Sequence, residues 1–295
     1  MSTRNILRTN IAQTIATLLF CLPFVSFGTP RQDSFEQHQN NLHSNKDEQL
    51  LITGLRDIRE QQLDGALEKL GTLVEVNPKF KLAQLIYGDL LLAKAGPMTD
   101  FGHTYSRKLQ DKITGLKNEA RSRWEHYSQS PNQDYIPSHL LKLSTEIKNA
   151  IVIDLSNARL YLYKNNQGKL DLVSDHYVSI GKNGAIKNVE GDKKTPIGVY
   201  HITNYLPPEG LPDFYGAGAF PLNYPNALDK IKGKTGHGIW LHGTPTDTYS
   251  RPPRASDCCV TLSNSALESL TPILQSGHTP FIITESINWV KKETA

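Results

Sequence analysis

The chain has 295 residues, which is enough for two domains of ordinary size. A composition of 38% hydrophobic and 21% charged residues is typical of a globular protein and excludes a disordered or fibrous one. The formal net charge of +3 includes two arginines near the N-terminus, in a segment without acids, so the remainder is nearly neutral. This balance, without a basic run, excludes nucleic acid as the main partner.

Residues 1–28 are predicted to be a signal peptide. Arg4 and Arg8 precede a mostly apolar stretch at 11–25, and small residues then end the segment at Gly28, the expected cleavage point. The predicted location is therefore the periplasm of the cell envelope. An uncleaved membrane anchor is the alternative, and only in that case would the protein contact the membrane.

Cleavage removes Cys21 and leaves Cys258 and Cys259 as the only cysteines. Two neighbours in sequence cannot form a framework of disulfides in an oxidising compartment. Thiols kept side by side therefore indicate reactivity.

The polar residues 29–47 are predicted to form a flexible linker, and residues 48–130 a small helical module. One helix ends at Asn77-Pro78, and a second runs from Phe80 to Gly96. A further helix is expected at 105–127. The apolar faces expected for the first and last helices are Leu63, Leu67, Leu70 and Val74, and Leu109, Ile113, Leu116, Ala120 and Trp124.

The pair of helices within 64–95 resembles a single tetratricopeptide-like hairpin of about 34 residues. Two roles are open for this module. It is either a structural cap, which the lack of an assignable exposed aromatic patch favours, or a docking surface for a partner protein or the cell wall. A single copy is weak evidence for the repeat, since such repeats usually stack at least three deep.

From residue 151 the pattern becomes β, after a linker that includes Ile136-Pro137. Residues 207–234, rich in Pro and Gly, are expected to form irregular cleft walls with a lid. Strands are expected at 151–153, 160–163, 169–180 and 199–204, with the last strand at 281–283; turns are expected at 165–168 and 183–184, and a short helix at 267–274.

The stretch 237–264 carries the chemistry. An apolar run ends at His242, and Gly243 interrupts it. After a long loop, Cys258 and Cys259 begin the next expected strand. This order suits a thiol nucleophile with an imidazole base, since the base assists formation of the reactive thiolate.

These residues resemble the active-site pattern of the L,D-transpeptidase (YkuD-type) catalytic domain, His-Gly followed by Ser-x-Gly-Cys. The matching residues are Ser256-Asp257-Cys258-Cys259-Val260, and two further motifs match at 177–181 and 191–200. The resemblance covers about 151–285. It implies an α+β protein: a mainly β catalytic domain at 148–287, a β-sandwich with a short helix, preceded by the all-α module.

The resemblance also implies a function. The nucleophile would be Cys259 and the base His242, without cofactor or metal. Cys259 would form an acyl-enzyme with a peptidoglycan tetrapeptide stem and pass it to an amine acceptor, in cell wall biogenesis and cell shape, and carbapenems would acylate it. The residues predicted to contact substrate or to stabilise the oxyanion are Gly243, Ser256, Asp257, Cys258, Arg254 and Tyr224.

Three positions depart from the family pattern: Asp257, Thr261 in place of an arginine, and Cys258 in place of a glycine. Cys258 could be a harmless change, a second nucleophile or a redox partner whose strained disulfide with Cys259 silences the enzyme. Arg251, like Arg254, could pair with the free carboxylates of stem peptides.

Alternative functions remain open at this stage. The same site could act as an L,D-carboxypeptidase, release a protein linked to peptidoglycan, or be an inactive wall-binding module with oxyanion geometry spoiled by Cys258. A zinc site including His237 is disfavoured, because His237 and His242 would face opposite sides of an extended segment.

Overall fold

The computed structural model describes residues 46–96, 101–104, 106–129, 134–141 and 143–292. These fall into two compact units, one within 46–129 and one within 134–292. The predicted signal peptide and nearly all of the predicted linker lie outside the described residues. No helix in the described ranges is both long enough and apolar enough to cross a membrane.

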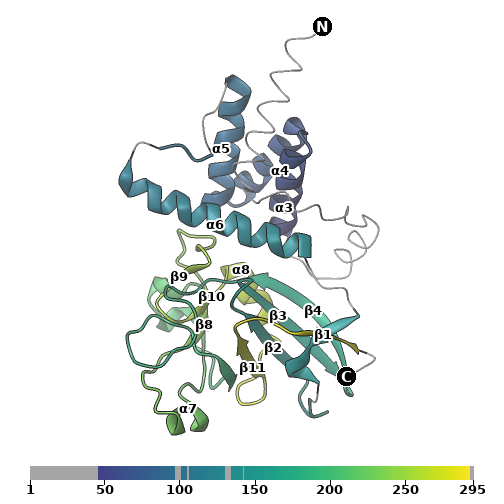
Figure 1. The fold of residues 1–295 in the computed structure, drawn as a ribbon, viewed down its shortest axis with the longest axis vertical. Helices are drawn as coiled ribbons and strands as arrows, with labels where there is room; N and C mark the ends of the chain where they lie inside the picture. Colours follow the sequence, from purple (N-terminus) through teal and green to yellow (C-terminus); the bar gives the residue numbers. More distant parts are fainter. Residues whose placement is uncertain (1–45, 97–100, 105, 130–133, 142, 293–295) are drawn as a thin grey trace. The chain divides into compact units, whose positions relative to one another are not determined.

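The first unit is helical, as the sequence predicts. The predicted helix breaks at Asn77-Pro78 and Gly96 are confirmed. An ion pair of 3.2 Å between Lys94 and Asp64 joins the end of the second hairpin helix to the beginning of the first, so the two run antiparallel. The helices of this unit are α3 (Lys46–Arg59), α4 (Leu63–Val76), α5 (Lys81–Ala95) and α6 (Arg107–Gln129) (Figure 1).

The buried face of α4 is Ala66, Leu70 and Leu73, and the predicted face was only partly right. Leu70 packs so closely against Gly54 of α3 that a Cβ at Gly54 would lie 2.9 Å from the Leu70 Cγ. The small Ala66 therefore faces the core, while Leu63 at the helix start is only half-buried. Leucine spacing alone could not show this.

Helix α6 is held to α3 by charge. Arg123 is buried and pairs with Glu119 at 2.9 Å and with Glu48 of α3 at 2.6 Å. Of the face predicted for α6, Trp124 is buried but Leu109 is 45% exposed. The fully buried residues of α6 therefore lie in its C-terminal half, although Ile113 also packs against Gly102.

A five-stranded sheet forms the centre of the second unit. Strands β2 and β11 run parallel, and the other neighbours are antiparallel. Figure 1 shows β4, β3, β2 and β11 side by side. The strand order is β4 (Lys169–Tyr177), β3 (Arg159–Asn166), β2 (Asn149–Asp154), β11 (Pro280–Thr284) and β6 (Gly198–His201).

Both faces of this sheet are buried. Successive residues of a strand point to opposite faces, so Ile151 and Ile153 enter one core cluster and Val152 enters the other. The first cluster includes residues of a second sheet and of α8 (Asn264–Leu270). The second sheet has the order β10 (Val260–Thr261), β8 (Trp240–His242) and β7 (Ala219–Pro221). The predicted sandwich of mainly β structure with a short helix is confirmed.

The other face of the five-stranded sheet is covered by an antiparallel ribbon of β1 (Tyr135–Pro137) and β12 (Trp289–Lys291). The linker predicted at Ile136-Pro137 was therefore wrong, and β11 is not the last strand. Trp289 packs edge-on against Tyr161 of β3, with ring centroids 5.3 Å apart. Strands of three residues, one containing proline, carry too little pattern to be predicted.

The stretch 207–234 is also more regular than predicted. It contains β7, the helix α7 (Ala227–Ile231) and two single 3-10 turns at Pro208–Gly210 and Asp213–Tyr215. A small parallel pair, β5 (Ile180–Gly181) and β9 (Arg254–Ser256), then brings the loop before Cys258 against the motif at 177–181.

Candidate active site

His242 ends strand β8 and is fully buried. Its Nδ1 lies 2.8 Å from the carbonyl oxygen of Gly243, and a carbonyl can only accept, so Nδ1 carries the hydrogen. Nε2 is then left as an acceptor. Burial lowers the pKa of His242 to about 4, partly opposed by the bond to Gly243, so the imidazole is neutral near pH 7. A neutral imidazole can take a proton from a thiol.

Gly243 turns the chain immediately after the histidine. Its N–H donates to the carbonyl oxygen of Tyr215 at 3.0 Å, and a Cβ there would lie 2.1 Å from Oδ1 of Asn264. That oxygen accepts from the backbone N–H groups of Ala217 and Thr244 at 2.9 and 3.0 Å. Close approach of the Asn264 side chain therefore requires glycine, and Asn264 fixes the loop that follows the histidine.

Cys259 comes just before strand β10, which lies parallel to β8 with Thr261 opposite His242. Cys259 lies two residues before Thr261, in the bend that leads into the strand. The Nε2 atom of His242 lies 3.4 Å from the Thr261 hydroxyl, and Cys259 Sγ donates to the carbonyl oxygen of Gly238 at 3.3 Å. The strand pairing thus places His242 at the end of β8 and Cys259 directly before its parallel neighbour β10.

The two neighbouring thiols are both free and ionise as a pair. A hydrogen bond from Cys259 lowers the pKa of Cys258 to about 7, helped by the charge of Lys187. The same bond raises the pKa of Cys259, as does burial, while the Trp240 N–H and the charge of Arg251 lower it. One thiolate is therefore available to the pair close to neutral pH.

The backbone at Cys258 tolerates a side chain. Five non-glycine residues of the described ranges have positive φ, and Cys258 is not one of them. Its N–H donates to Ser256 Oγ at 3.3 Å, and its carbonyl oxygen accepts from Thr195 Oγ1 at 3.0 Å. Replacing a glycine here causes no backbone strain, but this N–H, one of the predicted oxyanion donors, already has an acceptor.

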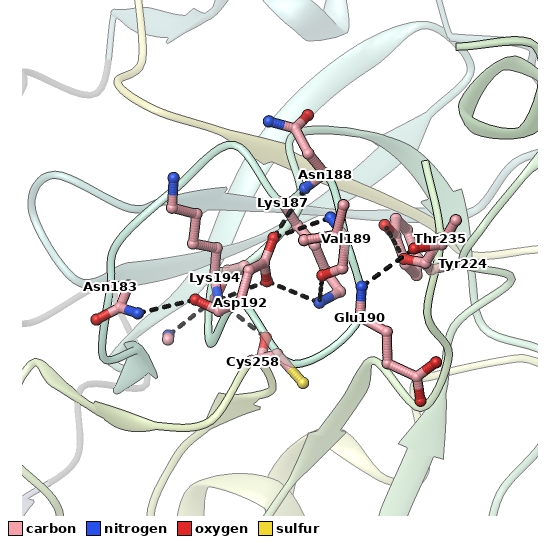
Figure 2. A network of polar contacts seen from close by, with 12 residues as sticks. Asn183, Lys187, Asn188, Val189, Glu190, Asp192, Lys194, Tyr224, Thr235 and Cys258 are labelled. Carbon is pink, nitrogen blue, oxygen red and sulfur yellow. Dashed lines mark hydrogen bonds and ion pairs between the residues drawn. The ribbon is translucent and has the colours of Figure 1, made fainter. Parts of the chain in front are cut away.

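A polar network beside Cys258 was not predicted (Figure 2). Its centre is the Asp192 carboxylate, which accepts from Lys187 Nζ at 2.8 Å and from the N–H groups of Asn188 and Lys194 at 2.9 and 3.1 Å. Burial alone would raise the pKa of Asp192, but these bonds outweigh it and lower the pKa to about 2. The network holds the buried ammonium of Lys187 near the thiol pair.

The other predicted residues lie in different surroundings. Ser256 is buried on β9, whereas Arg254 on the same strand is exposed. Asp257 is exposed and pairs with Lys182 at 2.9 Å. Tyr224 is buried in the core, and its hydroxyl donates to the carbonyl oxygen of Thr235 at 3.0 Å. The Tyr224 phenol is nonetheless within electrostatic reach of Cys258, whose charge helps to raise its pKa after burial and the charges of Asp229 and Asp192.

Aromatic residues and one arginine complete the surroundings of His242. The ring centroids of Tyr215 and Phe214 lie 5.1 and 5.6 Å from that of His242, and the Arg251 guanidinium lies 4.6 Å from the Phe214 centroid. The pKa of Tyr215 is raised by burial and by the charges of Cys259 and Cys258, so its phenol stays protonated and can donate a hydrogen bond. The aromatic content of 207–234 was a signal for these contacts, but it did not distinguish Phe214 and Tyr215 from the core residues Phe220 and Tyr224.

A shared metal site has no geometric support in the part of the chain that the structure describes. No three His, Cys, Asp or Glu side chains gather there as a set of ligands. His237 is exposed, 3.5 Å from Glu190, whereas His242 is buried.

Comparisons with known proteins agree with this architecture. Residues 148–283 match the family model of the YkuD-type L,D-transpeptidase catalytic domain. A search of curated proteins found no match. The chain is similar to the solved structures of Bd1075 from Bdellovibrio bacteriovorus and of the helical cell shape determining protein Pgp2 from Campylobacter jejuni.

The identities are 32% for Bd1075 and 31% for Pgp2, with TM-scores of 0.48 and 0.44. These alignments cover 55% and 49% of this chain, and 57% and 50% of those proteins. The chain thus spans about half the length of either protein. An L,D-transpeptidase from Stackebrandtia nassauensis is 13% identical, with a TM-score of 0.37, over 95% of this chain and 91% of that one. Residues 148–283 are thus similar to the catalytic domain of the YkuD-type L,D-transpeptidases, over a little less than half of this chain.

Proposed function

We propose that the protein is an exported cysteine enzyme that modifies peptidoglycan as an L,D-transpeptidase. The observation that carries the proposal is the buried, neutral His242, whose Nε2 is an acceptor and whose strand β8 lies beside β10, which begins directly after Cys259. The substrate class is taken from the family whose model residues 148–283 match.

The reaction follows from these positions. Nε2 of His242 takes the proton of the Cys259 thiol, and Sγ attacks the carbonyl carbon of the scissile peptide bond of a tetrapeptide stem. Backbone N–H groups around Cys259 and the protonated phenol of Tyr215 are the donors available to the developing oxyanion. The carbon–nitrogen bond then breaks, and the leaving amine takes the proton from His242. An amine of a neighbouring stem attacks the thioester and regenerates the thiol.

Water could replace the amine in the last step, which would make the protein a hydrolase of the same fold. An inactive wall-binding module, with oxyanion geometry spoiled by Cys258, is the other alternative. The ordinary φ of Cys258 speaks against it, whereas the Cys258 N–H, which donates to Ser256 Oγ at 3.3 Å, speaks for it.

Mass spectrometry of the products from purified tetrapeptide muropeptides tests the proposal. We expect cross-linked dimers with the native chain and none with Cys259→Ala, and a covalent carbapenem adduct that also requires Cys259. Shortened or released stems without dimers would make the protein a hydrolase. Absence of any product and of any adduct from the native chain would refute the proposed chemistry, and Cys258→Gly serves as the control for an inhibitory second thiol.

Export to the periplasm is a separate part of the proposal and rests on the sequence of residues 1–28. Sequencing the N-terminus of the protein from a cell-envelope fraction tests it. A mature chain that begins after Gly28 supports export with cleavage, and an intact N-terminus in a membrane fraction supports an anchor. Recovery only from the cytoplasm contradicts both.

A further inference from the structure

Arg251 is a cation near the candidate site that, among the described residues, has no ion pair with a carboxylate. Its guanidinium is half-buried over the Phe214 ring, which in turn lies beside the His242 ring. Its charge acts on both catalytic groups, because it lowers the pKa of Cys259 and of His242. The positive charge of Arg251 therefore lies at the position where a substrate would meet the nucleophile.

The segment that carries Arg251 is fixed at its backbone. The Tyr177 hydroxyl donates to the carbonyl oxygen of Arg251 at 3.0 Å, and Ser179 Oγ donates to that of Pro252 at 2.6 Å. The next carbonyl, of Pro253, accepts from the Ile180 N–H at 2.8 Å. Two consecutive prolines and three hydrogen bonds hold the arginine in one orientation, which lowers the entropic cost of binding a ligand.

The nearest acid is already engaged. Asp257 acts on Arg251 through its charge, but its carboxylate pairs with Lys182 at 2.9 Å, and both of those side chains are exposed. Within the described residues, Arg251 forms no ion pair of its own. A guanidinium presents five N–H donors in a planar fork that matches a carboxylate bidentately. Arg254, which the sequence favoured for this role, is exposed on β9.

We propose that Arg251, held over Phe214, binds the terminal carboxylate of the residue that leaves when Cys259 is acylated. This inference rests on the proposed function and makes it more specific. In a peptide cleaved before its last residue, the carboxylate lies within one residue length of the attacked carbonyl, about 3.8 Å between successive Cα atoms. A cation whose charge reaches Cys259 therefore selects stems that end one residue beyond the scissile bond, and disfavours cleavage within a longer chain.

Alkylation of Cys259 tests the anion site without peptidoglycan. Iodoacetate and iodoacetamide both transfer a CH₂ group to the thiolate and lose iodide, but only iodoacetate carries a carboxylate. The ratio of their rates at one pH cancels any change in the thiolate fraction. We expect this ratio, measured at Cys259 by tandem mass spectrometry, to fall about tenfold in Arg251→Gln. In Arg251→Lys, which keeps the charge but loses the planar fork of donors, the ratio should lie between those of the native chain and Arg251→Gln.

Arg254→Gln is the matched control, because it removes the same charge from an exposed position three residues away. The ratio should stay at the native value in this variant. An equal fall of the ratio in Arg251→Gln and Arg254→Gln would mean that it reports the general electrostatic field of the protein and not a specific anion site. No fall in Arg251→Gln would mean that the guanidinium does not bind the anion. Either result overturns the inference.

Turnover separates the inference from the proposed function. The native chain should process a tetrapeptide stem with a free terminal carboxylate at least about tenfold more efficiently, in kcat/KM, than the same stem with a terminal carboxamide. Arg251→Gln should lose this preference. Equal turnover of acid and amide by the native chain would overturn the role of Arg251 and leave the proposed function intact. Turnover of neither would contradict the proposed function, while the alkylation ratio would still decide whether Arg251 binds a carboxylate.

Discussion

We expect a large and specific loss of folding stability when the negative charge of Asp192 is removed. Asp192→Asn keeps the shape of the side chain but removes the charge that holds Lys187, whose side chain is only 3% exposed. Breaking a buried pair from one side leaves the other charge uncompensated, and this is among the costlier single changes in a folded protein.

The size of the expected loss of stability follows from the pKa of Asp192. Its lowering from 3.8 to about 2 means that the folded protein favours the ionised carboxylate. One pKa unit corresponds to about 1.4 kcal/mol, so the ionised form contributes about 2.5 kcal/mol. Because the folded-state pKa is below the unfolded one, this stability is present above about pH 4 and is lost as the pH falls toward 2. The difference in the free energy of unfolding between the native chain and Asp192→Asn should narrow over the same pH interval.

Differential scanning calorimetry of the full chain at pH 7 measures the effect. We expect the transition of the unit that carries Asp192 to shift down by roughly 5–10 °C. Asp257→Asn is the matched control, because its partner Lys182 is exposed and such pairs contribute less than about 1 kcal/mol. Adding Lys187→Met to Asp192→Asn should recover part of the loss. A shift for Asp192→Asn no larger than for Asp257→Asn would refute the reasoning.

Three further outcomes are expected. The native chain should lose folding stability as the pH falls from about 6.5 to 4, because burial hinders protonation of His242 in the folded state. His242→Gln should remove this loss, and a calorimetric pH profile equal to that of the native chain would contradict the reasoning. Gly181→Ala should lower the melting temperature, since a Cβ there would lie 2.6 Å from a backbone oxygen, whereas Gly210→Ala, with open space around it, should not. Cys258→Ala should speed iodoacetamide alkylation of Cys259 near pH 8, because the neighbour that raises the pKa of that thiol is gone; slower alkylation would count against the coupled pair.

The fold was predictable wherever the pattern was long or locally punctuated. The breaks at Asn77-Pro78 and Gly96 follow from proline and glycine chemistry and need no tertiary information. Strands β1 and β12 were not predictable, since each has three residues and is stabilised by a partner more than 150 positions away in the chain. The buried face of α4 depended on Gly54 of α3, which a single-helix periodicity cannot include.

The site divides in a similar way. His242 and Cys259 stand out because their residue types carry chemistry and because a family pattern joins them. In the fold, His242 ends β8 and Cys259 directly precedes the parallel strand β10. The residues that orient and charge the site come from distant segments, and nothing local marks them. Asn264 lies 22 positions after His242, and Lys187 lies 71 positions before Cys258, yet each acts directly on a segment of the site.

The second thiol changes what a pH profile of this site would report. The imidazole of His242 is already neutral above about pH 4, so its protonation cannot govern reactivity near neutral pH. The first ionisation of the Cys258–Cys259 pair falls at about 7, so a rise in thiol reactivity near that pH belongs to the pair. A negative charge on Cys258 disfavours a negative charge on Cys259, so Cys258 raises the pKa of the nucleophile. Arg251 counteracts this competition from the other side, because its charge favours the thiolate of Cys259. The reactivity of Cys259 therefore depends on two opposing neighbours, and changing Cys258 or Arg251 alone should move it in opposite directions.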